Sequence, residues 1–389
     1  MPVGWLALLT GLFWIGDRSL YHKLYYALLA APALAIVLLH PSRAAPVCRH
    51  PLVFTYILFA SYICLSIVWS NSETKALSLL KRPLYVLVLL LSAGLLASGR
   101  SQILIRALKA AALIATISAV LSYGYFLYSG HGAAGQRFDG YGALYNPLLT
   151  GHMYGFFAAF WLASWFIARQ AWAPVPLICL GILGAVVIGT GSRTPLLALS
   201  ATALWLCIAS ADRRGLVVVL FGAVLGIALL FFYPTAIMSR GLSYRPDIWV
   251  EALTMANQQL LFGHGYDHQL MLGLKGTELA FNDPHNIELA VLLAGGLVGL
   301  GLWVALYGIA LTYIWRNRTN PSVLIASALL VFGLVSGLTE GRDFLSRPKE
   351  HWFLIWIPFS LLLHAWLLSA AEPTATQPTN QQKGVPNRN

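Results

Sequence analysis

The sequence predicts an all-α polytopic integral membrane protein. Of its 389 residues, 58% are hydrophobic and only 10% are charged, and the mean hydropathy is +0.70. A typical soluble domain has about 25% charged residues. The apolar residues also gather in runs of roughly 20, the length that a helix needs to cross about 30 Å of hydrocarbon. These observations place the chain in a lipid bilayer.

Such runs, separated by charged or turn residues, predict about 12 transmembrane helices. In chain order they cover residues 3–16, 24–40, 51–69, 80–98, 108–128, 148–168, 173–190, 195–211, 215–234, 286–315, 321–339 and 350–370. The first run lacks a charged segment before it and a small-residue cleavage site after it. We therefore expect it to stay in the protein as a helix, not to act as a secretory signal.

The spans form a single predicted transmembrane domain, residues 1–371. Its largest outward loop, at about 235–285, lies between spans 9 and 10 and should contain short helices, one of them beginning at Pro246. Residues 372–389 are polar and rich in proline, and we expect them to form a disordered cytoplasmic tail.

Basic residues are distributed unevenly over the loops. If the N-terminus is cytoplasmic, the loops on that side hold twelve Lys or Arg residues against two acidic ones. This asymmetry follows the positive-inside rule and predicts that both termini are cytoplasmic. It also accounts for the net charge of +11, so the basic balance does not indicate nucleic-acid binding.

The sequence offers little sign of a metal or disulfide site. Its four cysteines form no CxxC pair and no disulfide framework. His264 and His268 are spaced like two ligands on one helix face, which would suit zinc. Gly263 and Gly265 disfavour a helix there, and we predict no metal and no cofactor.

The predicted chemistry lies in the outward loops, because the spans are nearly free of ionisable groups, whereas transporters usually place charges at mid-membrane. Three outward helix starts combine proline with a basic side chain: Arg193 in "GSRTP", Arg245 in "SYRPD" and His285 in "NDPHN", with Asp283 as the expected N-cap. Helix N-termini and guanidinium groups together would bind a phosphate or pyrophosphate. Interfacial anchoring of the arginines and a structural hydrogen bond of His285 are the alternatives.

These residues carry a family resemblance. "HNIELAVLLAGGLVG" fits the pattern H-[N/S/Q]-x9-G-x-x-G, with His285, Asn286, Gly296 and Gly299 at its fixed positions; "RTPLL" fits R-x3-L, from Arg193 to Leu197; and "YRPDIW" surrounds Arg245. With the predicted spans and the large outward loop, the chain resembles the bacterial O-antigen ligases. O-antigen polymerases and other lipid-linked glycan ligases share this layout, but the spacing after His285 favours a ligase.

The resemblance implies an enzyme of the bacterial inner membrane with a periplasmic active site. It would transfer polysaccharide from undecaprenyl pyrophosphate to a sugar hydroxyl of the lipid A core, which makes lipopolysaccharide. Its partners would be this lipid-linked donor, the lipid A-core acceptor and membrane lipids, with no nucleic acid. The alternatives are a polymerase or another lipid-linked glycan ligase, and a lipid-linked sugar flippase.

Under this reading Arg193 and Arg245 bind the pyrophosphate, and His285 takes the acceptor's proton or hydrogen-bonds a phosphate. We expect the first helical turn and the nearby arginines to disfavour the imidazolium form of His285, and Glu288, at i+3, to orient its ring. Asn286 is the second residue of the motif, and Glu340 and Arg342 are further possible substrate contacts.

The motif glycines have a separate predicted role. In a continuous helix Gly296 would lie on nearly the same face as His285, about 16 Å further along the helix into the membrane. Small residues at that depth would let another helix, or a polyprenyl chain, approach closely.

Overall fold

The computed structural model describes residues 1–99, 102–130, 136–168, 173–214, 216–217, 219–220, 222–224, 244–274 and 278–371. Most of the predicted ninth span, the start of the outward loop and the predicted tail lie outside these residues, so those predictions stay untested.

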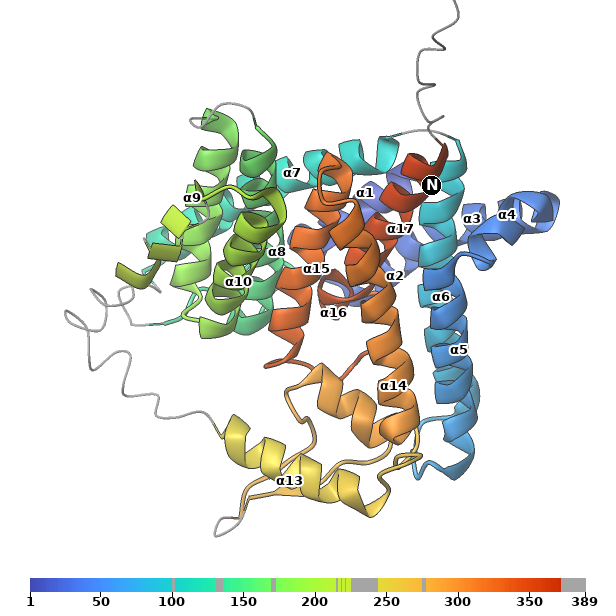
Figure 1. Cartoon of the computed structure of the whole chain (residues 1–389). Helices are drawn as coiled ribbons and strands as arrows, with labels where there is room; N and C mark the ends of the chain where they lie inside the picture. The colour runs from blue at the N-terminus through green and yellow to red at the C-terminus, as the bar shows by residue number, and fades with distance from the viewer. Residues whose placement is uncertain are drawn as a thin grey trace, which may run out of the picture.

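The described chain is a bundle of helices (Figure 1). In order they are α1 (Pro2–Thr10), η1 (Gly11–Phe13), α2 (Arg18–Tyr25), η2 (Tyr26–Ala30), α3 (Ala31–Leu39), α4 (Pro41–Cys48), α5 (Pro51–Leu65), η3 (Ser66–Trp69), α6 (Ala76–Ser98), α7 (Ile103–Tyr128), α8 (Pro147–Ile167), α9 (Pro174–Gly189), α10 (Arg193–Ser210), α13 (Arg245–Gln258), α14 (Ile287–Arg316), α15 (Pro321–Gly337), α16 (His351–Leu354) and α17 (Trp356–Ala371).

Six helical stretches of the described chain are long and apolar enough to cross a membrane: Arg18–Leu39, Pro51–Trp69, Ala76–Ser98, Ile103–Tyr128, Arg193–Ser210 and Ile287–Arg316. Shorter apolar helices cover Pro2–Phe13, Pro174–Gly189, Pro321–Gly337 and Trp356–Ala371. The protein is therefore a multi-pass helical membrane protein, as predicted, while the number of about 12 spans remains a prediction.

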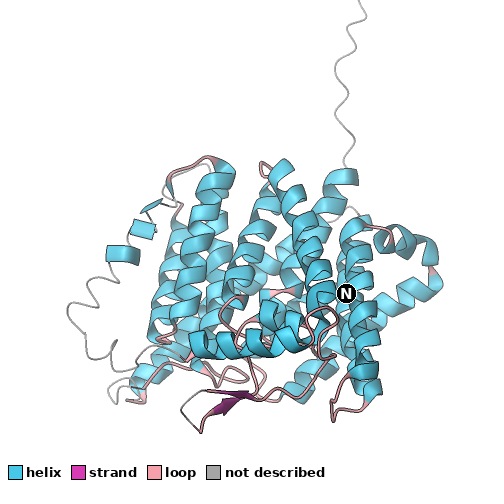
Figure 2. Ribbon diagram, turned by 60° about the horizontal axis from the view of Figure 1, so that its bottom comes forward, coloured by secondary structure: helices cyan, strands magenta, loops and turns pink. Residues whose placement is uncertain are grey.

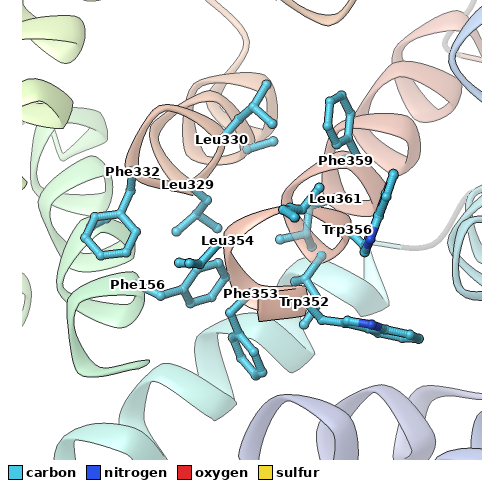
Figure 3. Packing of buried hydrophobic residues seen from close by; sticks show 14 of the residues in the cluster. Phe156, Leu329, Leu330, Phe332, Trp352, Phe353, Leu354, Trp356, Phe359 and Leu361 are labelled. Carbon is cyan, nitrogen blue, oxygen red and sulfur yellow. The ribbon is translucent and has the colours of Figure 1, made fainter. Parts of the chain in front are cut away.

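Large apolar side chains fill the centre of the bundle, where α15, α16 and α17 meet α8 (Figure 3). Trp352, Phe353 and Trp356 are each at most 1% exposed. α16 and α17 are separated at Ile355, whose φ and ψ are −123° and −73°. A Cβ at Gly333 of α15 would overlap the backbone of Leu354. The glycine thus allows α15 to lie directly against α16.

Glycines on α8 bring α10 and α15 close in a similar way. A Cβ at Gly151 would lie 3.1 Å from Pro195 Cγ of α10, and one at Gly155 would lie 2.6 Å from the ring of Phe332 of α15. Small residues four apart on one helix face permit such close helix contacts. They hold the first turn of α10, which begins with Arg193, next to the end of α15.

α14 is broken at Gly296, contrary to the prediction of one continuous helix. Gly296 has φ 60° and ψ −160°, a region that is essentially restricted to glycine. The prediction that Gly296 lies below His285 on one helix face is therefore wrong, because the segment Ile287–Gly295 and the residues after Gly296 do not share a helix axis. The 20 residues from 297 to 316 still give about 30 Å of helix.

The part of the outward loop just after α13 inserts at this break. His264 and Gly265 donate backbone hydrogen bonds to the carbonyls of Leu293 and Ala294, and Leu297 and Val298 donate to the carbonyls of Leu260 and Leu261. These bonds satisfy the backbone groups that the broken helix leaves unpaired. Gly296 thus fastens the loop to α14 and sets the direction of the segment that follows His285.

The remainder of the loop lies across one end of the bundle, which we call the outer end. α13 crosses there beside α14 (Figure 1), and a two-stranded antiparallel sheet, β1 (Leu272–Gly273) with β2 (Ala280–Phe281), lies at the same end (Figure 2). α13 buries Ile248, Ala252 and Ala256 on the face that packs inward. The described part of the loop therefore contains one helix and a small sheet.

Candidate active site

Glu340 joins two of the predicted site residues at the outer end. It lies just beyond α15 and is 7% exposed. Arg245 Nη2 donates to its Oε2 at 2.8 Å, and His285 Nδ1 lies 3.6 Å from its Oε1. The second distance is longer than a hydrogen bond and within the range of an ion pair. Residues that are far apart in the sequence therefore meet around one carboxylate.

His285 stands just before α14, not in its first turn. Asn286 is the N-cap: its Oδ1 accepts from Leu289 N at 2.9 Å, and its Nδ2 donates to Leu338 O at 2.8 Å. Asp283, which we expected to cap the helix, accepts instead from His285 N at 2.8 Å. This bond accompanies a φ of 48° at His285, which is unusual for a residue other than glycine.

The pKa of His285 is raised above its ordinary value. The nearby Glu340 carboxylate is the largest cause, and it outweighs partial burial; Asp283 raises the pKa further, while Arg245 opposes the shift. The expectation that the imidazolium is disfavoured is wrong, because the carboxylates of Glu340 and Asp283 outweigh the opposing effects of burial and Arg245. Burial alone would raise the pKa of Glu340, but His285, His152 and Arg245 lower it overall.

Glu340, not the predicted Glu288, is the carboxylate beside the imidazole. Glu288 lies in the first turn of α14 and is half-buried. With Nδ1 of His285 turned to Glu340, Nε2 is the ring nitrogen that can meet a substrate. A carboxylate, a histidine and a reacting group in this order form a well-known general-base arrangement.

Arg193 lies at the start of α10, beside this group. It is exposed, and the next residue, Thr194, is buried. Thr339 Oγ1 lies 3.1 Å from Thr194 Oγ1, which connects the first turn of α10 to the residue before Glu340. Trp249 Nε1 of α13 donates to Pro284 O at 3.1 Å, which connects the helix of Arg245 to the residue before His285. The structure thus brings the three predicted helix starts together.

The three helix N-termini differ in their capping. The N-cap residues of α10 and α13, Ser192 and Tyr244, make no side-chain cap hydrogen bond, whereas the side chain of Asn286 caps α14. The first-turn N–H groups of a helix, with the positive end of the dipole, favour an anion. An anion at this site would therefore find such groups beside Arg193 and Arg245.

Arg342 connects two segments of the outer end. Its Nη1 donates to Asn282 O at 2.7 Å and its Nη2 to His268 O at 2.8 Å. It ties the segment before His285 to the segment around the two loop histidines. The ring centroids of those histidines are 4.9 Å apart with the rings tilted, and His264 Nε2 lies 2.8 Å from Met255 O. Within the described ranges no three His, Cys, Asp or Glu side chains form a group that could hold a metal ion.

Sequence reasoning missed residues that surround the site. His152 on α8 is 1% exposed and interacts electrostatically with Glu340 and Arg245. The ring of His351 packs against Gly341, where a Cβ would lie 2.7 Å from its Nε2. The position of His152 in the apolar run of α8 could have indicated a functional role, because ionisable side chains are rare in membrane spans.

Together these features define a class: a multi-pass membrane protein with a cationic, carboxylate-bridged site at one end of its helices. Comparison with known proteins identifies the family. Residues 177–304, which include Arg193, Arg245 and His285, match the family model described as O-antigen ligase. An O-antigen ligase of Pseudomonas aeruginosa strain PAO1 is 50% identical over 370 residues, which cover 94% of this chain and 90% of that relative.

The chain belongs to the O-antigen ligase family. The family resemblance drawn from the three short motifs is thereby confirmed. The roles of the individual residues stay predictions.

Proposed function

We propose that the protein transfers a polysaccharide from undecaprenyl pyrophosphate to a sugar hydroxyl of the lipid A core, and so completes lipopolysaccharide. The observation that carries this proposal is the meeting of Arg245, His285 and Glu340 at the outer end, next to the start of α10. Family membership supports the reaction type. We place the site in the periplasm and both termini in the cytoplasm, on the strength of the basic loops.

In the proposed reaction the acceptor oxygen attacks the anomeric carbon of the donor sugar. The bond from that carbon to the pyrophosphate oxygen breaks, and undecaprenyl pyrophosphate leaves with the bonding electrons. Negative charge grows on the leaving group, so fixed cations beside it lower the barrier. Arg193 and Arg245 supply planar two-point donors that suit phosphate oxygens. On donor binding the pyrophosphate would compete with Glu340 for Arg245.

His285 is the proposed base for the acceptor's proton. A base works best when its pKa lies near the ambient pH, and the carboxylate beside Nδ1 moves the pKa of His285 upward from 6.5. Glu340 also stabilises the imidazolium that forms after proton transfer, as in other carboxylate–histidine pairs. The alternative role, a hydrogen bond from the ring to a phosphate oxygen, uses the same nitrogen, Nε2.

We further propose that the transfer needs no metal ion. Two guanidinium groups and the positive dipole ends of α10 and α13 can balance the charge of the leaving pyrophosphate. The donor already carries a good leaving group, so the reaction needs no nucleotide sugar.

A transfer assay with the purified full-length protein tests the proposal. The donor is an undecaprenyl-pyrophosphate-linked glycan, and the acceptor is either lipid A-core or a second lipid-linked glycan. We expect product with lipid A-core. Product formed only with the second lipid-linked glycan would instead show a polymerase, and movement of donor across vesicles without any product would show a flippase.

A further inference from the structure

We propose that Arg137 is a positioning residue that fixes the turn before Arg193, and thereby the orientation in which Arg193 meets the donor pyrophosphate. This inference rests on the proposed function of Arg193. Arg137 lies between α7 and α8, outside the segments whose motifs indicated the family.

The guanidinium of Arg137 holds the turn that connects α9 to α10. Its Nε donates to Thr190 O at 2.7 Å, and its Nη2 donates to Ser192 Oγ at 2.8 Å. The next residue, Phe138, donates its backbone N–H to Gly189 O at 3.0 Å. Three hydrogen bonds from two adjacent residues therefore reach three of the four residues that precede Arg193.

The turn itself leaves little room for other conformations. Thr190 and Ser192 are 0% and 3% exposed. Thr190 Oγ1 donates to Val187 O at 2.6 Å and accepts from Ser192 N at 3.2 Å. Gly191 has a φ of 60°, in the left-handed region that glycine adopts readily. Across the turn, a Cβ at Gly151 of α8 would lie only 3.0 Å from Thr190 Oγ1.

Arg137 can act as a fixed support because its neighbour is anchored. Phe138 is 0% exposed. Its ring lies 5.2 Å from that of Tyr123 and 5.4 Å from that of Phe126, both on α7, in edge-on contacts. The bonds of Arg137 thus connect the end of α7 to the start of α10.

The turn controls Arg193 because Ser192 is the residue directly before it. Thr194, the residue after Arg193, places its Oγ1 3.1 Å from Thr339 Oγ1. Displacement of the turn would therefore move the start of α10 relative to Thr339. It would therefore also change the position of Arg193 relative to Glu340 and Arg245. A misplacement of about 1 Å in a reacting group can cost on the order of 10² in rate.

Arg137→Lys is the central test, because an ammonium keeps the charge but cannot reach a carbonyl and a hydroxyl with the fixed fork of a guanidinium. The matched control is Arg318→Lys, at the far end of α14, where the guanidinium lies 4.6 Å from the ring of Trp315. Arg193→Lys and the double variant Arg137→Lys/Arg193→Lys complete the set. Rates with the undecaprenyl-linked donor and lipid A-core give kcat and KM, and thermal unfolding in detergent gives the midpoint.

We expect Arg137→Lys to lower kcat by about 10–10²-fold, with a thermal midpoint close to that of Arg318→Lys. The double variant should be about as slow as Arg193→Lys alone, because Arg137 acts through Arg193. The inference would be overturned if the double variant showed the product of the two single losses in kcat. It would also be overturned if Arg137→Lys kept a near-normal kcat while Arg193→Lys was slow. If Arg193→Lys itself is fully active, the proposed role of Arg193 fails instead.

Ser192→Ala keeps the inference testable if Arg137→Lys does not fold. This variant removes one of the two guanidinium bonds and leaves the bond to Thr190 O. We expect a smaller loss in kcat, and no further loss when Ser192→Ala is combined with Arg193→Lys. Unchanged kcat in Ser192→Ala, or losses that multiply, would count against the positioning role.

Discussion

Replacing Gly296 with alanine tests whether the break in α14 determines the site. The new Cβ would overlap Leu261 O and lie 2.5 Å from Gly263 N, at a φ of 60° and a ψ of −160°. Backbone strain of this kind costs about 1–3 kcal/mol. If relief of the overlap breaks two of the four backbone hydrogen bonds at the break, these add about 0.5–1.5 kcal/mol each. We therefore expect a destabilisation of about 2–6 kcal/mol.

The assay compares thermal unfolding midpoints and transfer rates in detergent. Gly301→Ala is the control, because a Cβ at Gly301 meets nothing within 4 Å and alanine is a better helix former by about 1 kcal/mol. We expect Gly301→Ala to match or exceed the unaltered protein, and Gly296→Ala to lose both stability and transfer, since the segment carrying His285 changes direction. Equal midpoints and rates for both variants would refute this account of the motif glycine.

Four further predictions concern the site and the topology. His285→Ala should leave a folded, membrane-inserted protein whose transfer rate falls by about 10²–10⁴-fold; near-normal transfer would return His285 to a structural role. Arg245→Lys should lower the transfer rate by about 10²–10³-fold although the charge is kept. The unaltered protein should stay active in EDTA. Loss of activity on chelation, with rescue by Mg²⁺ or Mn²⁺, would show that a metal carries the leaving-group charge. Because the pKa of His285 is raised, its pairing with Glu340 should stabilise the fold fully below pH 6.5 and lose this effect as the pH rises through the raised value. In Glu340→Gln this pH dependence of stability should shrink, and the rising limb of the transfer rate against pH should move to lower pH. Unchanged stability and rate profiles in Glu340→Gln would exclude the pair. A reporter fused after Trp315 or Ala371 should be cytoplasmic and one near Lys275 periplasmic, and the reverse pattern would contradict the proposed location of the site.

Local patterns could predict which helix starts meet at the candidate site. Arg193 and Arg245 are the first residues of α10 and α13, as their neighbouring prolines indicated. The carboxylate partner of His285 was predicted incorrectly, because the spacing within one helix pointed to Glu288, whereas Glu340 arrives from the loop after α15. Arg137 carries no motif, and only its contacts show that it holds the turn before Arg193.

The sequence by itself determined that this chain belongs in a lipid bilayer, that it is helical and which residue types its candidate site offers. These properties follow from composition, from runs of apolar residues and from short motifs, all of which act over a few turns of helix. Only the tertiary structure decided which groups meet. The pKa of His285 depends on Glu340 and Asp283 together, and the break at Gly296 exists because the outward loop supplies hydrogen-bond partners to both halves of α14. Both effects depend on distances of a few Å between segments far apart in the chain, and periodicity within one segment carries no information about such distances.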